Sequence, residues 1–266
     1  MDKILGHSDL SLVSQRCSVL TKLTLLLPPS NKNNSSSELF ENIPPMNFIE
    51  HLRVKNLTCE QLLNLLNRTQ KKVRHLYIES SPIAEHLSSR DLGKISDLCP
   101  DLRSLHIHMP LLGYDGISNA SFYMRKKPIF PHVEFLSLDI YCHQLPPSML
   151  VILYFLTPES LKAVEIRSMM SLDDLDWKHL LMSRFFRNAE AFMHRGLTYN
   201  PLNAFRVLCA APRLLHTSLL GGFEQRIQLY DEFRISEKGY DQYKSENYNF
   251  WPEMPVEWEN ETTDIM

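Results

Sequence analysis

Glycine is scarce in this sequence, with 8 residues in 266, whereas an ordinary protein has about 7%. Phosphate-binding loops and nucleophile elbows depend on glycine, and none of the patterns G-x-x-x-x-G-K-[ST], G-x-G-x-x-G or G-x-S-x-G occurs. The zinc-protease pattern H-E-x-x-H is also missing. These absences exclude the common nucleotide-binding and hydrolase motifs. We therefore expect a binding protein that is not an enzyme and that needs no cofactor or metal.

Paired cysteines and long apolar runs are missing as well. The five cysteines, at positions 17, 59, 99, 142 and 209, form no C-x-x-C pair, and an odd number does not suit a fully paired disulfide framework. No stretch approaches the roughly 20 apolar residues that cross a bilayer, and the N-terminus has no apolar signal segment. We expect no membrane association and a reducing compartment, namely the cytoplasm, with the nucleus as a further location.

Charge is unevenly distributed along the chain. From Glu224 onward, 11 acidic and 4 basic residues give a net charge of −7, so the remaining 20 acidic and 24 basic residues give +4. A charge of +4 spread over the long N-terminal part is too dilute for a nucleic-acid interface, which needs basic residues gathered on one face. We therefore expect no nucleic-acid partner.

A repeated apolar pattern, L-x-x-L-x-L, is the most informative feature of the sequence. Its last L-x-L carries two apolar side chains on one face of a short strand, and the intervening residue points to the other face. One such strand cannot bury its apolar face alone, but stacked copies can. Successive copies are separated by 24 to 31 residues, close to the range of leucine-rich repeats. The copies are Leu20/Leu23/Leu25, Ile49/Leu52/Val54, Val73/Leu76/Ile78, Leu102/Leu105/Ile107, Val133/Leu136/Leu138 and Leu161/Val164/Ile166, followed by the degenerate Ala189/Phe192/His194 and Leu214/Thr217/Leu219.

Helices are predicted between several of these strands. Thr58 and Gln61 form a capping-box pattern before a leucine-rich run. Asn200 and Pro201 supply an N-cap and a first-turn proline. A helix is also expected after Ser171 and another within 84–98. The predicted fold is an α/β leucine-rich-repeat solenoid, or horseshoe, of about eight repeats, with a parallel sheet on the concave face and helices on the convex face.

The pattern C-x-x-L-x-x-L-x-[LI] occurs twice, from Cys17 and from Cys99. The phrase Leu98-Cys-Pro-Asp-Leu-Arg-Ser-Leu105 resembles the cysteine-containing repeats of the F-box/leucine-rich-repeat protein family. The resemblance covers about residues 17 to 220 and implies the substrate-recognition part of a cullin-type ubiquitin ligase, with a protein target and a ligase adaptor as partners. The segment before Leu20 is too short for an F-box, so none is expected here. The alternative is a leucine-rich-repeat scaffold or inhibitor with no role in ubiquitination.

Target binding is predicted on the concave face, where three parallel columns of side chains flank the strand leucines. The columns mix basic, acidic and aromatic residues, which suits a polypeptide of mixed charge; the alternative is that most of them are simply solvated. The candidate contact residues are Arg53, Lys55, His75, Tyr77, Glu79, His106, His108, Asp139, Glu165 and Arg167.

Histidines on neighbouring strands suggest a second use of this face. His51, His75, His106 and His108 fall on adjacent strands, about 4.8 Å apart. A metal-binding or pH-sensitive site is therefore the sharper hypothesis, and ordinary surface histidines are the simpler one.

Two domains are predicted. Residues 1–222 form the solenoid, with a short N-terminal cap and loop insertions at 28–45 and 110–131. Residues 223–266 form an acidic, aromatic C-terminal cap or tail. Two placements are open for this tail: residues 228–235 pack on the last repeat, or the C-terminal segment folds back across the basic columns of the concave face.

Overall fold

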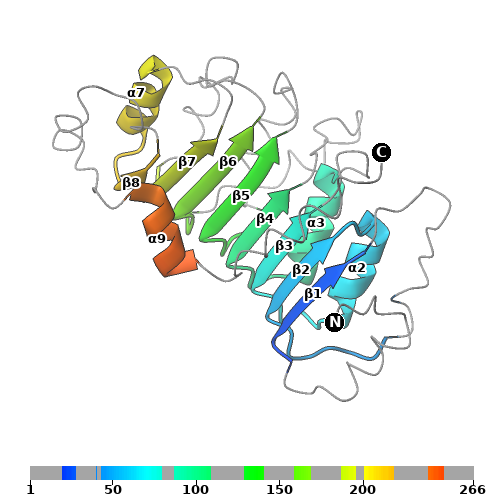
Figure 1. Ribbon diagram of the computed structural model, residues 1–266. Helices are drawn as coiled ribbons and strands as arrows, with labels where there is room; N and C mark the ends of the chain where they lie inside the picture. The colour runs from blue at the N-terminus through cyan, green and yellow to red at the C-terminus, as the bar shows by residue number, and fades with distance from the viewer. Residues whose placement is uncertain are drawn as a thin grey trace, which may run out of the picture.

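The computed structural model describes residues 20–27, 40, 43–79, 87–108, 129–140, 159–168, 187–195, 201–218 and 239–248. These residues contain one eight-stranded parallel sheet in which the strands follow one another in chain order, as Figure 1 shows. The predicted α/β class and parallel sheet are thus confirmed. The strands are β1 (Lys22–Leu26), β2 (His51–Lys55), β3 (His75–Glu79), β4 (Ser104–His108), β5 (Phe135–Ile140), β6 (Ala163–Ser168), β7 (Ala191–Arg195) and β8 (His216–Thr217).

Strand pairing follows the register that the repeats predict. The central apolar residues lie opposite one another from strand to strand, so that Leu52 pairs with Leu76 and Leu76 with Leu105. The register holds even where the pattern is degenerate, because Phe192 pairs with Thr217. A slip of one residue would turn every apolar side chain to the opposite face, so the buried face keeps the register.

The same backbone hydrogen bonds recur at the start of successive strands. The amide of Glu50 donates to the carbonyl of Thr21, Arg74 donates to Glu50, and Arg103 donates to Arg74. The series continues through Glu134, Lys162, Glu190 and Leu215, each donating to the equivalent residue of the strand before it. Each unit is therefore joined to the previous one in the same way.

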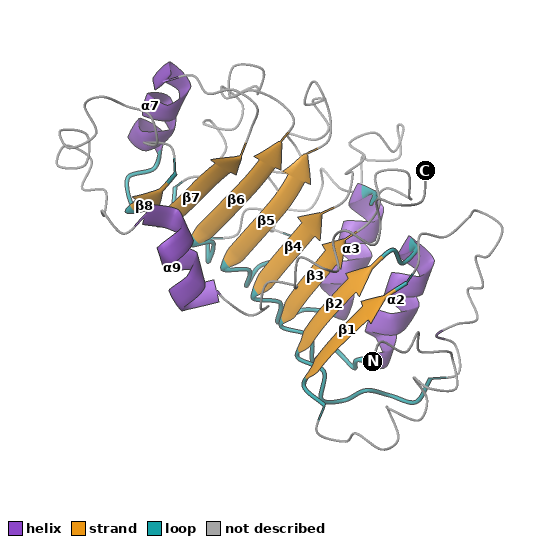
Figure 2. Ribbon diagram, in the orientation of Figure 1, coloured by secondary structure: helices purple, strands orange, loops and turns teal. Residues whose placement is uncertain are grey.

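The hydrophobic core lies between the leucine face of the sheet and the helices α2 (Cys59–Arg68), α3 (Ser89–Leu98) and α7 (Pro201–Ala210). Leu65 of α2, Ile95 of α3 and Val207 of α7 are fully buried in this core. Figure 2 shows α2 and α3 on the far side of the sheet. We call this side the helix-covered face.

Helix starts agree with the capping signals. Thr58 and Gln61 form the predicted capping box of α2, in which each side chain accepts a hydrogen bond from the other residue's backbone amide. The helix expected within 84–98 begins only at Ser89, because Ser88 forms a second capping box with Asp91. Helix α7 begins at Pro201, as predicted. The helix expected after Ser171, most of the insertions 28–45 and 110–131, and the cap 228–235 lie outside the described residues.

The opposite side of the sheet, which we call the polar face, carries the three predicted columns of side chains. One described helix, α9 (Gly239–Tyr248), lies on this face beside β7 and β8 (Figures 1 and 2). Its Tyr240 and Tyr248 form a small second cluster with sheet residues, namely Phe135, Ala163, Ala191 and Met193. Part of the C-terminal segment thus lies on the polar face, at the strands far from β1. In the described part of the chain, no helix is long and apolar enough to cross a lipid bilayer.

Candidate binding face

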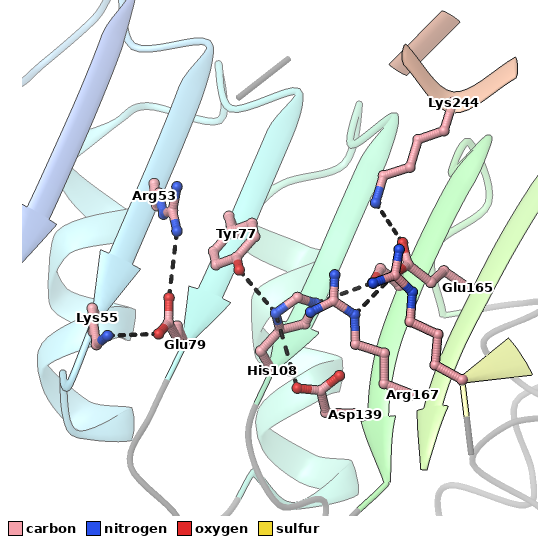
Figure 3. Close-up of polar contacts among 11 residues, drawn as sticks. Arg53, Lys55, Tyr77, Glu79, His108, Asp139, Glu165, Arg167 and Lys244 are labelled. Carbon is pink, nitrogen blue, oxygen red and sulfur yellow. Dashed lines mark hydrogen bonds and ion pairs between the residues drawn. The ribbon is translucent and has the colours of Figure 1, made fainter. Parts of the chain in front are cut away.

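The ten predicted contact residues all lie on the polar face, but they differ in accessibility. Lys55, His75, Tyr77, Glu79 and Arg167 are partly exposed. The other five, Arg53, His106, His108, Asp139 and Glu165, are buried. Figure 3 shows that most of them form clusters with one another. The sequence placed the residues on the face, but it did not show that half of them are packed away from solvent.

The first cluster lies on β2 and β3. Glu79 forms two ion pairs, one with Lys55 Nζ at 2.7 Å and a longer one with Arg53 Nη2 at 3.5 Å. The guanidinium of Arg53 lies over the ring of Tyr77, 4.3 Å from its centre, which is within the range of a cation–π contact. Glu79 therefore positions both cations, and Arg53 in turn packs over the ring of Tyr77.

The second cluster joins β3, β4 and β5 through His108. The Tyr77 hydroxyl lies 2.8 Å from His108 Nδ1, and Ser137 Oγ lies 3.1 Å from His108 Nε2. Asp139 Oδ2 is 3.9 Å from His108 Nδ1. Burial, followed by the positive charge of Arg167, lowers the pKa of His108 to about 3. His108 is therefore neutral at ordinary pH and joins three strands by hydrogen bonds.

Ser137, His108 and Asp139 have the residue types of a hydrolytic triad, but the geometry disfavours that chemistry. The Ser137 side chain has an exposed fraction of 0%, so a substrate carbonyl has no route to its oxygen. A histidine with a pKa of about 3 is also a poor general base at neutral pH. Its Nδ1 is closer to the Tyr77 hydroxyl than to Asp139. The arrangement supports a rigid polar core, not nucleophilic catalysis.

Two further predicted residues, His75 and His106, take part in stacked rings. Its ring stacks on that of His51, with 4.4 Å between ring centres. Burial, and then the neighbouring charge of His51, lowers the pKa of His75 to about 4. His106 belongs to the Tyr77 side, because its ring stacks on Tyr77 at 5.1 Å. Of the four histidines, His51 stacks with His75, and His106 lies edge-on to His108.

The third cluster surrounds Glu165 on β6. Its Oε1 atom lies 2.9 Å from Arg167 Nε and 3.8 Å from Arg195 Nε, and its Oε2 lies 2.5 Å from Lys244 Nζ on α9. Burial alone would raise the pKa of Glu165, but the charge and hydrogen bond of Lys244, and then those of Arg167, hold it below the usual value. Glu165 is thus an ionised, fully buried acceptor with three cations around it.

The predicted contact residues did not include Lys244 or the aromatic residues of α9, although a fold-back of the aromatic C-terminal segment onto this face was one of the two expected placements. Tyr243 stacks on His216 at 4.3 Å, and its hydroxyl lies 3.3 Å from Glu190 Oε2. Tyr248 lies 5.0 Å from Phe135, measured between ring centres. A signal was present in the sheet columns, because their residues change from polar to apolar or small at Phe135, Ala163 and Ala191. Such a change on a sheet face indicates that another element covers it.

Potential metal ligands and three cysteines occur among the described residues. No group of three or more His, Cys, Asp or Glu residues among them is arranged to hold a metal ion. In the same ranges Cys99 and Cys209 are free thiols. Burial raises the pKa of Cys99 to about 12, so this thiol is unreactive at neutral pH.

Comparison with known proteins does not assign the chain. It matches no protein-family model and shows no significant similarity to a curated protein.

Proposed function

We propose that the chain is a leucine-rich-repeat solenoid of horseshoe form that binds a protein partner with its polar face. Three observations support the repeat architecture. The apolar pattern recurs along the sequence, the strands pair in chain order, and equivalent backbone hydrogen bonds join each unit to the previous one. A stack of equivalent units produces a long, continuous face that suits an extended partner.

The observation that carries the binding proposal is the array of accessible side chains on β1 to β3. The register of these strands places their residues in rows, with strands about 4.8 Å apart. The array contains both signs of charge and an aromatic ring. Its members are Lys22, His51, Lys55, His75, Tyr77 and Glu79.

The chemistry of the array favours a polypeptide of mixed charge. Tyrosine and arginine, together with tryptophan, are enriched among the residues that carry most of the affinity at protein interfaces. Here Tyr77 is held by Arg53 through its ring and by His108 through its hydroxyl. A side chain that is already fixed loses little conformational entropy on binding. Tyr77 is therefore the residue that we expect to contribute most to partner affinity. The charged residues around it would give selectivity.

The resemblance to F-box/leucine-rich-repeat proteins supports a more specific role as the substrate receptor of a cullin-type ubiquitin ligase. In the phrase that carries this resemblance, Cys99, Leu102 and Leu105 are buried in the core, so the cysteine serves as an apolar residue in the turn from α3 to β4. The alternative is a scaffold or inhibitor of the same repeat class. The two roles differ in whether a ligase adaptor is bound.

Affinity purification of the full chain from cells, followed by quantitative mass spectrometry, tests both proposals. We compare the wild type with the double variant Lys22→Glu/Tyr77→Ala and with Lys94→Glu, which makes the same charge change on α3, at the helix-covered face. Chemical denaturation first establishes that all three proteins are folded.

Polar-face binding predicts proteins that are recovered with the wild type and Lys94→Glu but lost with the double variant. A cullin and its adaptor among the wild-type partners would support the receptor role, and face-dependent partners without them would support the scaffold or inhibitor. If no recovered protein depends on the polar face, the binding proposal is wrong.

A further inference from the structure

Helix α9 contacts Glu165 as a ligand contacts its binding site, through one charged side chain, and not through core packing. Arg167 and Arg195 both lie against Oε1 of Glu165. Within the described ranges, Lys244 is the one donor to Oε2, at 2.5 Å. Glu165 itself has an exposed fraction of 0%, so removal of Lys244 leaves half of a buried carboxylate without its cation. Removal of one partner from a buried ion pair is strongly unfavourable, because it leaves a buried charge uncompensated.

Helix α9 is also poorly suited to exist without the sheet. It has 10 residues, fewer than the roughly 12 to 15 that an isolated helix needs in water. Tyr240 and Tyr248 are buried against the sheet and Lys244 is partly buried, while Asp241, Gln242, Ser245, Glu246 and Asn247 are exposed. Because the helix is short and buries only one side, its helical form depends on its contacts with the sheet.

The position of α9 continues the accessible array. A row of rings runs from Tyr77 to His106 at 5.1 Å and from His106 to Phe135 at 4.7 Å. Tyr248 of α9 extends this row from Phe135 at 5.0 Å, and Lys244 Nζ lies 5.6 Å from the centre of the Phe135 ring. The row of rings that begins on β3 therefore ends on α9, so α9 lies where the proposed binding face continues across the sheet.

We propose that Glu165 and the Phe135 ring form a lysine-binding subsite of the polar face, and that α9 is an internal ligand which the partner displaces. This proposal rests on the proposed binding function. The partner segment that fits the subsite carries a lysine whose ammonium reaches Glu165 Oε2, with tyrosine or a similar aromatic residue on the same side to lie against Phe135, Ala163 and Ala191. The segment of this chain that carries the same pattern is Tyr240-x-x-Tyr243-Lys244 in α9.

A labelled synthetic peptide of residues 239–248 tests this directly. The receiving protein is the full chain with Tyr240→Ala/Lys244→Ala, which loosens its own α9 and leaves Glu165 and the sheet unchanged. Fluorescence polarisation should show saturable binding of the peptide to this variant. Binding to the wild type should be at least about tenfold weaker, because its own α9 competes at high effective concentration. The milder single variant Lys244→Ala serves if the double variant does not fold.

Changes in the peptide identify the recognised group without any risk to the fold of the protein. A peptide with Lys244→Ala should bind at least about tenfold more weakly, as expected for loss of a charge-assisted contact to a buried acid. A peptide with Gln242→Ala, changed on the exposed side, should bind unchanged. The proposal is overturned if the loosened protein does not bind the peptide, if it binds no better than the wild type, or if the Lys244→Ala peptide binds equally well.

The peptide measurement needs no cellular partner, so its failure is distinguishable from failure of the proposed function. Loss of peptide binding with retained, Tyr77-dependent partners would make α9 a fixed structural cap. Peptide binding without such partners would instead leave the lysine subsite established and contradict the array on β1 to β3 as a protein-binding surface.

Discussion

The polar face of β1 to β3 and that of β5 to β7 have the same backbone geometry and different surfaces. In the column that precedes the central apolar residue of each strand, the first region presents Lys22, His51 and His75, all at least partly exposed. The corresponding positions of the second are Phe135, Ala163 and Ala191, all buried. Helix α9 lies against the second region. The repeat determines where a side chain points, and the residue at that position determines whether it faces solvent or another part of the chain.

The two regions also treat charge differently. Around Glu79, the cations Lys55 and Arg53 come from the neighbouring strand β2. Around Glu165, one of three cations comes from α9, distant in sequence. Local pairing needs no further element, whereas the buried Glu165 relies on a separate segment for the cation at its Oε2 atom. This difference makes the second region the one that a change in the C-terminal segment can alter.

The largest expected effect comes from the core that both regions share. Leu105 on β4 is fully buried between them, and Leu105→Ala should lower the free energy of unfolding by about 2 to 5 kcal/mol. Urea unfolding followed by tyrosine and tryptophan fluorescence measures the loss, and hydrogen exchange should report faster opening in β2 and in β6 alike. If exchange increased on only one side of β4, the two halves of the sheet would open independently, contrary to this prediction.

Acid should weaken the sheet, starting from β4. The pKa of His108 is lowered by burial from 6.5 to about 3, and burial also lowers that of His106 well below 6.5. The unfolded chain therefore binds more protons below pH 6.5. The contribution of the two neutral histidines to the free energy of unfolding is therefore fully present above pH 6.5. It is lost as the pH falls toward 3, by up to about 1.4 kcal/mol per pH unit for each histidine.

Urea unfolding between pH 7.5 and 5 measures this dependence. His108→Gln should make it shallower, and His132→Gln, at an exposed histidine, is the matched control. An equally steep pH dependence in the His108→Gln variant would show that His108 does not cause the loss of stability in acid.

A smaller and local effect is expected at Tyr240, which distinguishes the two regions most clearly. Tyr240→Ala should open α9, with faster hydrogen exchange at 240–248 and a loss of about 1 to 3 kcal/mol in local stability. Protection at 51–79 should stay unchanged, because the first region makes no described contact with Tyr240.

Tyr240→Phe is the control for that change. The buried Tyr240 hydroxyl has no hydrogen-bond partner among the described residues, so its removal should cost nothing or stabilise α9 slightly. A large loss in the phenylalanine variant would reveal a partner for the hydroxyl.

The smallest effect is expected at the helix caps of the first region. Thr58→Ala removes the side-chain acceptor for the amide of Gln61 and should cost about 1 kcal/mol. Ser88→Ala at α3 is the equivalent change and should cost a similar amount. Thermal unfolding followed by circular dichroism measures both, and neither should alter hydrogen exchange in α9.

How far the sequence predicts the fold depends on the range of the interaction. Strand register was predictable because each L-x-L places its own apolar side chains, and α2 was predictable because Thr58 and Gln61 are three residues apart. Helix α9 was not, because its charged and polar residues carry little helical periodicity and its stability comes from strands far away in the chain. The pairing of Lys244 with Glu165 spans 79 residues, and no spacing rule connects such positions.

The sequence alone determined that the chain forms a stack of parallel strands with one apolar and one polar face, since alternation along a strand is a local property. The tertiary structure decided which part of the polar face α9 covers and that His106, His108 and Glu165 are buried. Burial and charge pairing depend on which segments meet in space, and only the folded chain brings Lys244 to Glu165.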